Sequence, residues 1–156
     1  MTQAPGHVRQ LLEAMNQDGG HGGALGFQLV EADAAGVVLK TPYRPEFVGD
    51  PDTGVLAGGV VTALLDHVSG QAVFAAGADG GSIATLDLRI DYMRGAEPGR
   101  DLYAHAHCYK LTRSVAFVRA VAYEHSPDDP VATAQSAFML DANAGRRPGA
   151  NLRPAR

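Results

Sequence analysis

The sequence of 156 residues is 46% hydrophobic and 19% charged, which is enough apolar material for one compact core and too little for two. Its 19 glycines follow no collagen-like period, which excludes a fibre, and its formal net charge of −4 argues against a nucleic-acid partner, because phosphate binding needs concentrated positive charge. Cys108 is the only cysteine, which excludes an intramolecular disulfide framework.

The first predicted element is an amphipathic helix near the N-terminus. Apolar residues at positions 8, 11, 12 and 15 recur with helical spacing, and the glycines at 19 and 20 end the pattern. Residues 27–32 and 36–41 are then typical of two strands around a tight turn, and three prolines between positions 42 and 51 predict a loop. We expect an N-terminal helix and glycine-rich linker over residues 1–25, and the main domain over residues 26–141.

Residues 54–76 are predicted to supply the central element of the fold. From Val60 onward the segment is apolar around nearly the whole circumference of a helix, which is typical of a helix buried on most sides. The glycine-rich segment 77–81 is expected to end this helix.

Four strands are expected after this helix. Apolar and polar residues alternate over 82–93, with Leu88 and Ile90 on one face and Thr85 and Asp87 on the other, so the polar face is expected to be solvent-exposed or functional. Residues 101–111 and 115–124 each carry small side chains on one face, which we expect to pack on the helix, and bulky ones on the other, which meet another subunit or solvent. With a last strand over 131–140, four antiparallel strands in meander-like succession give an α+β fold.

The C-terminal residues 142–156 are rich in glycine, proline and arginine, and we expect them to be disordered. They hold four arginines and no acidic residue, so the rest of the chain has a net charge of −8. No segment has the apolar length of a signal peptide or of a membrane span. We therefore expect a soluble cytoplasmic protein with no membrane partner.

Asp66 lies on the most apolar helix of the chain, where an ionised carboxylate is costly unless it has a partner. Its helical neighbours Thr62, Ser69 and Gly70 form a narrow strip of small or polar residues. Two interpretations are open at this point. The strip is either the solvent-exposed edge of the helix, or it presents a general base or nucleophile.

Gly58 and Gly59 precede the helix and leave its first N–H groups free to approach a ligand, where they would stabilise negative charge on an oxygen. The alternative is a plain glycine-rich helix start. Gly59 and Asp66 are about 10 Å apart along a helix at 1.5 Å per residue, too far to act on one carbonyl carbon. Two antiparallel helices in a symmetric dimer would bring the N-terminus of one to the aspartate of the other.

Three segments together resemble a known family: GVLAGGVVTALLD over 54–66, TLDLRIDYMRGA over 85–96 and KLTRSVAFVRA over 110–120. They are similar to hotdog-fold acyl-CoA thioesterases of the phenylacetate-pathway (PaaI-like) type, and the similarity covers roughly residues 26–140. The resemblance implies a long central helix wrapped by an antiparallel β-sheet. It also implies homodimers with shared active sites, pairing of dimers into a homotetramer, and hydrolysis of an aryl or short to medium acyl-CoA without a cofactor.

The resemblance also assigns site residues. The family's His-Gly-Gly motif and the aspartate nine residues after its histidine fall on Ala57, Gly58, Gly59 and Asp66. Thr85 stands where relatives have a Ser or Thr that positions the attacking water, and the hairpin that contacts the CoA phosphates and pantetheine falls on Thr112, Arg113 and Ser114. Ala57 replaces the family's histidine, and the asparagine often found six or seven residues earlier is here Asp50 or Pro51.

Three other functions are weighed against this one. Ala57 leaves open a non-catalytic hotdog protein that binds acyl-CoA. A hotdog hydratase ranks last, because the hydratases resemble a pattern with Asp and His five residues apart in a longer loop and helix, whereas Asp101 and His105 are four apart on a predicted strand. A metal site at His105 and His107 is disfavoured, because no carboxylate or cysteine follows at ligand spacing. Cys108 is interpreted as a packing residue, and His67 as a structural or pocket-rim residue.

Overall fold

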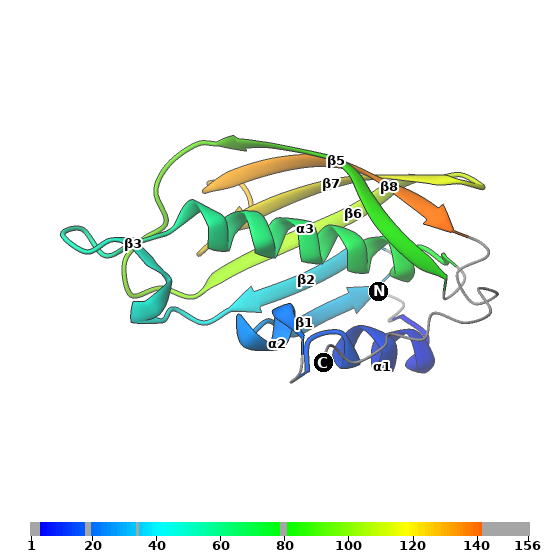
Figure 1. The fold of residues 1–156 in the computed structure, drawn as a ribbon, viewed down its shortest axis with the longest axis horizontal. Helices are drawn as coiled ribbons and strands as arrows, with labels where there is room; N and C mark the ends of the chain where they lie inside the picture. Colours follow the sequence, from blue (N-terminus) through cyan, green and yellow to red (C-terminus); the bar gives the residue numbers. More distant parts are fainter. Residues whose placement is uncertain (1–3, 18–19, 34, 79–80, 142–156) are drawn as a thin grey trace, which may run out of the picture.

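The computed structural model describes residues 4–17, 20–33, 35–78 and 81–141 (Figure 1). Within this part of the chain a long helix, α3 (Gly58–Ala75), lies across one face of a six-stranded antiparallel sheet. The sheet runs in the order β1 (Gln28–Asp33), β2 (Gly36–Thr41), β6 (Leu102–Leu111), β7 (Val115–Tyr123), β8 (Ala132–Asp141), β5 (Ser82–Tyr92). The expected α+β hotdog architecture is confirmed.

The remaining elements lie below the sheet edge and at one end of the helix in Figure 1. Helix α1 (Gly6–Ala14) packs on β1 and α3 through its buried Leu12, and the four-residue α2 (His21–Ala24) falls in the segment expected as a linker. The predicted proline-rich loop holds a 3-10 turn (Pro45–Phe47) and a small hairpin of β3 (Val48–Asp50) and β4 (Val55–Leu56). This hairpin leads the chain into α3.

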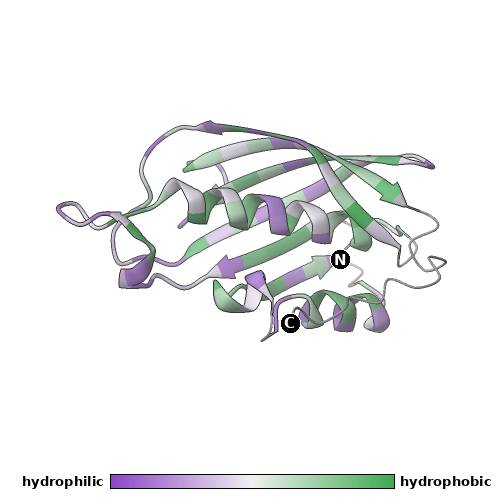
Figure 2. Ribbon diagram, viewed as in Figure 1, coloured by the Kyte–Doolittle hydropathy of each residue, from purple (hydrophilic) through white to green (hydrophobic). Residues whose placement is uncertain are grey.

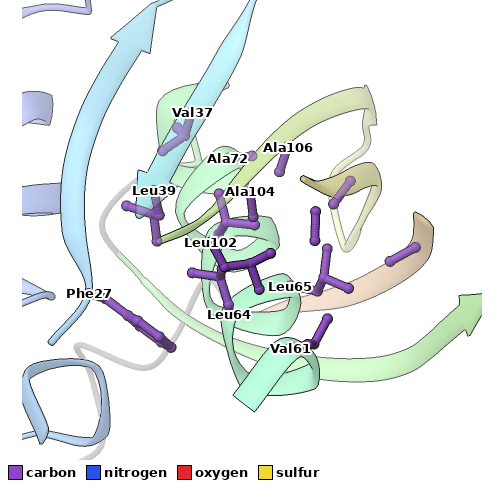
Figure 3. Close-up of a cluster of buried hydrophobic side chains, with 14 of the residues drawn as sticks. Phe27, Val37, Leu39, Val61, Leu64, Leu65, Ala72, Leu102, Ala104 and Ala106 are labelled. Carbon is purple, nitrogen blue, oxygen red and sulfur yellow. The ribbon is translucent and has the colours of Figure 1, made fainter. Parts of the chain in front are cut away.

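The core lies between α3 and the inner face of the sheet (Figure 3). As predicted, the small faces of the strands pack on the helix: Ala104 and Ala106 of β6 are fully buried, and so is Ala116 of β7. Small side chains let the strands approach the helix backbone, while Leu64 and Leu65 of α3 fill the space between them. In Figure 2, α3 is mainly hydrophobic or neutral in colour, with a hydrophilic band partway along it.

The expected succession of four meander strands is wrong for β5. Strands β6, β7 and β8 do follow one another, but β5 pairs with β8 at the far edge of the sheet. The reason is that β2 occupies the other edge of β6, with Val37 opposite Ala106. The strand after the helix therefore finds its hydrogen-bond partners on the last strand, and β5 becomes an edge strand.

The strict alternation predicted over residues 82–93 is also interrupted. The register between β5 and β8 shifts between Thr85 and Asp87, and Leu86 in this irregularity is 56% exposed, whereas Leu88 packs against the core. Residues seven apart face opposite sides of a regular strand, but one extra residue in a bulge restores them to the same side. Thr85 and Tyr92 accordingly both reach α3 from β5.

Among the described helices, none has the length and apolar character that crossing a membrane requires. Residues 142–156, for which disorder was expected, lie outside the described residues.

Candidate active site

Asp66 of α3 and Thr85 of β5 lie side by side. The Thr85 hydroxyl donates a hydrogen bond of 2.9 Å to Oδ1 of Asp66, and the Asp66 side chain is half-buried. No hydrogen bond from the described residues reaches Oδ2. The family resemblance implies that Thr85 positions the attacking water. In this structure the Thr85 hydroxyl contacts the Asp66 carboxylate itself. The contact places the carboxylate between α3 and the edge strand β5.

Asp66 and two of the strip residues beside it, Thr62 and Gly70, lie against β5. Thr62 Oγ1 is 2.8 Å from the hydroxyl of Tyr92, and a Cβ added at Gly70 would lie 3.4 Å from Cδ1 of Ile83. Ser69, one position before Gly70, is fully buried, and its hydroxyl has no partner among the described residues. The strip therefore packs along the edge strand, which places small side chains where helix and strand approach.

The first turn of α3 presents unpaired N–H groups at Gly58 and Gly59. Both residues are exposed, and no side chain caps this helix end, where Ala57 is the N-cap. The Ala57 N–H donates to the Phe47 carbonyl at 2.8 Å, and the Val60 N–H donates to the Ala57 carbonyl at 3.0 Å. In the part of the chain that is described, the N–H groups of residues 58 and 59 have no partner, as expected for the start of a helix.

Tyr92 is a site residue that the sequence reasoning did not single out. Its hydroxyl donates a hydrogen bond of 2.8 Å to the carbonyl oxygen of Gly58. In a regular strand Tyr92 lies on the same face as Leu88 and on the opposite face from Thr85, because seven residues separate Thr85 from Tyr92. Only a bulge between them puts both side chains on one face, and the sequence pattern does not reveal that bulge.

Gly59 and Asp66 are not brought together within one chain. They occupy one continuous helix, in which seven residues span about 10 Å. The single chain thus holds a possible carbonyl-polarising group and a possible base at separate positions.

The hairpin residues lie at the β6–β7 turn. Thr112 shapes it: its hydroxyl donates to the Val115 carbonyl at 2.7 Å and accepts the Val115 N–H at 3.0 Å. Ser114 contributes its carbonyl to the Leu140 N–H at 2.9 Å, and Arg113 is exposed at the tip. Val115 and Ala84 both pair with Met139, so the hairpin emerges at the same end of the sheet as Thr85.

Asp50, near the position of the family's asparagine, is used within the β3–β4 turn. Its carboxylate accepts the Thr53 hydroxyl at 2.7 Å and the Asp52 N–H at 3.1 Å, and these bonds lower the pKa of this exposed group. A Cβ at Gly49 would come within 2.8 Å of the Ala57 Cα, so the turn packs directly on the helix start.

His67 does not share a site with Asp66. Its Nε2 lies 2.9 Å from Oδ1 of Asn16, which also accepts the Gln71 amide at 2.8 Å, so the cluster joins α3 to the segment after α1. Burial lowers the pKa of His67, against the opposing charge of Asp66. Because its ring is engaged with Asn16, His67 is a structural residue.

The remaining candidate sites, a metal site, the Cys108 thiol and two small cavities, have weaker support. Within the described residues no group of three or more histidine, cysteine or acidic side chains is arranged to hold a metal ion. Burial raises the pKa of the Cys108 thiol, which opposes a nucleophilic role. Two small cavities, of about 80 Å³ and 30 Å³, flank the β1–β2 turn, and neither is lined by Asp66, Thr85 or the glycines of the α3 start.

Comparisons with known proteins show which family the chain is similar to. A family model described as thioesterase superfamily matches residues 53–130, which include the helix and β5. Acyl-coenzyme A thioesterase 13 of Homo sapiens is 30% identical over 120 residues, covering 75% of this chain and 82% of the human protein.

Two solved structures are similar as well. A Pseudomonas aeruginosa protein has 39% identity and a TM-score of 0.73, over 85% of this chain and 95% of its own. A phenylacetic acid degradation-related protein of Ralstonia eutropha has 27% identity and a TM-score of 0.72, over 85% of this chain and 98% of its own.

Proposed function

The chain belongs to the thioesterase superfamily, and we propose that it hydrolyses the thioester bond of an acyl-CoA with Asp66 as the reactive carboxylate. The observation that carries the proposal is the hydrogen bond from Thr85 to Asp66, because it holds one carboxylate oxygen and leaves the other available. Aryl and short to medium acyl groups are the candidate substrates, and the Ralstonia eutropha relative supports the aryl class.

The proposed site is shared between two subunits. The Gly59 N–H, together with that of Gly58, donates a hydrogen bond to the thioester carbonyl oxygen, which becomes negatively charged as the carbon is attacked. Asp66 of the partner subunit acts on the same carbonyl carbon. The 10 Å or so between Gly59 and Asp66 along one helix supports this division, since an antiparallel pair of helices closes it.

Two routes lead from this site to the products. As a general base, Asp66 takes a proton from water while the water oxygen bonds to the carbonyl carbon; the carbon–sulfur bond then breaks, and the departing CoA sulfur takes up a proton. As a nucleophile, the carboxylate bonds to the carbon and expels CoA, and water hydrolyses the resulting anhydride. Both routes give the free acid and CoA. Thr85 orients the carboxylate in each of them.

CoA recognition is assigned to the β6–β7 hairpin. Arg113 is exposed at its tip, where the guanidinium is free to pair with a phosphate. Thr112 and Ser114 hold the turn through the bonds described above, which fixes the direction in which Arg113 projects.

The second candidate function is acyl-CoA binding without hydrolysis, and Ala57 is the observation that favours it. The family's histidine is missing at this position, next to the glycines of the helix start. Binding of an acyl-CoA to the wild-type protein at micromolar concentration, with no release of thiol, would support this alternative.

The test is a thiol-release assay over short, medium, long and aryl acyl-CoAs, with wild type and Asp66→Asn. We expect Asp66→Asn to lower kcat by about a hundredfold or more and to leave the oligomeric state unchanged. Asp128→Asn, an exposed carboxylate in the turn before β8, is the matched control and should keep wild-type activity. Full activity of Asp66→Asn overturns the assignment of the reactive carboxylate.

A further inference from the structure

The Tyr92 hydroxyl lies on the first turn of α3 within a compact set of three oxygens. It is 2.8 Å from the Gly58 carbonyl oxygen and 2.8 Å from Thr62 Oγ1, which is itself 3.0 Å from the same carbonyl. Two hydroxyl protons serve these three contacts. A phenol is the more acidic donor, so Tyr92 donates to the carbonyl while Thr62 donates to Tyr92.

The acceptor in this set belongs to one particular peptide unit. The carbonyl of Gly58 and the N–H of Gly59 are the two ends of a single planar, resonance-stabilised amide. A hydrogen bond accepted by the carbonyl draws electron density from the nitrogen and makes the N–H a stronger donor. In an α-helix this carbonyl already accepts the N–H of residue 62, so the Tyr92 hydroxyl is a second donor on it.

On the basis of the proposed role of the Gly59 N–H, we propose that Tyr92 is a positioning residue for thioester hydrolysis. Its hydroxyl, supported by Thr62, polarises the peptide between Gly58 and Gly59 and strengthens the Gly59 N–H as a donor to the oxyanion. A stronger donor helps most where negative charge has developed on the substrate oxygen, which is the transition state. The hydroxyl therefore acts on kcat more than on KM.

Two further features fit this role. No side chain caps the start of α3, so Tyr92 is the side chain that donates to its first carbonyl, with the Thr62 hydroxyl donating to Tyr92 in turn. Tyr92 reaches that carbonyl because of the irregularity between Thr85 and Asp87, which also lets Thr85 reach Asp66. One bulge in β5 thus serves both halves of the proposed chemistry, the carbonyl-polarising end and the carboxylate.

The kinetic test compares Tyr92→Phe, Thr62→Val and Thr62→Ser with wild type. Loss of the Tyr92 hydroxyl should lower kcat about threefold to tenfold, less than the loss of a whole oxyanion donor, and leave KM within about twofold. Thr62→Val should show a smaller decrease, and Thr62→Ser, which keeps the hydroxyl, should restore kcat. Tyr43→Phe is the matched control, because the Tyr43 hydroxyl donates a bond of the same 2.8 Å length to the Gly54 carbonyl outside the helix.

A spectroscopic test reads the peptide directly in the free protein. With glycine labelled at its carbonyl carbon and its nitrogen, a carbonyl-to-amide correlation spectrum contains only Gly-Gly pairs, which the sequence has at 19–20, 22–23, 58–59 and 80–81. The cross-peak of the 58–59 pair is identified by its loss in Gly59→Ala. This substitution fits the fold, because a Cβ at residue 59 has no neighbour within 4 Å in the described structure. Tyr92→Phe should move the amide proton of this cross-peak upfield, and Tyr43→Phe should leave it in place.

The outcomes separate this proposal from the proposed function. Wild-type kcat in Tyr92→Phe, or an unmoved 58–59 cross-peak, overturns the role of Tyr92. A decrease in kcat matched by an equal rise in KM also overturns it, because that pattern indicates a disturbed binding site. Full activity of Asp66→Asn contradicts the proposed function instead, while the cross-peak still reports whether Tyr92 polarises the peptide.

Discussion

The Thr85 hydroxyl and the Asp66 carboxylate are joined by a hydrogen bond of 2.9 Å between edge strand and central helix. The bond engages Oδ1 and leaves Oδ2 without a hydrogen bond from the described residues, so the carboxylate has one held oxygen and one that can meet a substrate or a water. A half-buried acid on so apolar a helix is thereby given a fixed orientation, which is what a base or a nucleophile requires.

Thr85→Val tests whether that orientation matters. The variant keeps the β-branched shape but removes the donor, so we expect kcat for acyl-CoA hydrolysis to fall about tenfold as the carboxylate loses its alignment. Thr85→Ser keeps a hydroxyl and should retain activity within about twofold of wild type. Steady-state thiol release measures both, and equal activity of the Val and Ser variants would show that the hydrogen bond has no part in turnover.

The sequence was sufficient for the long helices and strands and for their packing, but not for the short elements within residues 21–24 and 45–56 or for the course of β5. The small faces of two strands, with Ala104 and Ala116, predicted that the helix packs on them, because only small side chains let the helix backbone come so close to the strands. The place of β5 at the sheet edge depends on which edges other strands occupy, and single-segment patterns carry no such information. The bulge after Thr85 is likewise visible only in the register with β8, and without it Tyr92 appears on the wrong face.

The salt dependence of substrate binding tests Arg113. A guanidinium that pairs with a CoA phosphate is screened by salt, so the KM of wild type should rise with ionic strength, and that of Arg113→Ala should start about fivefold higher and rise less. Arg100→Ala, another exposed arginine, is the control. An acyl-pantetheine substrate, which lacks the nucleotide phosphates, should be hydrolysed equally by wild type and variant, and an unchanged KM of Arg113→Ala for acyl-CoA would exclude the contact.

The ion pair between Arg94 and Glu124 is predicted to be a main contributor to stability. Glu124 is 7% exposed, and Arg94 donates to its two oxygens at 3.2 and 2.7 Å while the Glu97 N–H donates at 2.6 Å. Glu124→Ala leaves the Glu97 N–H without its acceptor and reduces the partners of Arg94 to Asp129 and the Gly95 carbonyl, and it should lower the free energy of unfolding by about 3 kcal/mol. Urea denaturation measures this, and a loss below about 1 kcal/mol would contradict it.

The same pair predicts a pH dependence. Burial opposes ionisation of Glu124, but the bonds from Arg94 and Glu97 outweigh it and the pKa in the folded protein is lowered. Its contribution to stability is therefore complete above the unfolded value near 4.5 and declines as the pH falls below that value toward the folded pKa. The difference in unfolding free energy between wild type and Glu124→Gln should narrow over that acidic range and stay constant from pH 6 to 8 or so. A constant difference down to pH 3 or so would show that the charge of Glu124 is not responsible.

Mixing two inactive variants tests whether Gly59 and Asp66 act from different subunits. Asp66→Asn removes the carboxylate, and Gly59→Val places a branched side chain at the helix start, in space that is free within the described chain. In a mixed dimer with shared sites, one site receives both mutations and the other receives neither. Random exchange of equal amounts makes half of the dimers mixed, so about a quarter of wild-type activity should return.

Mixed dimers form only if subunits exchange, so each variant is purified alone, unfolded or dissociated together with the other, and refolded as a mixture. A mixture of Asp66→Asn with wild type gives the baseline, because exchange there creates no new intact site. If both residues of a site belonged to one subunit, every mixed dimer would carry two damaged sites and activity would stay at the level of the separate variants. Recovery to about a quarter therefore distinguishes shared sites from two independent ones without any change to the substrate.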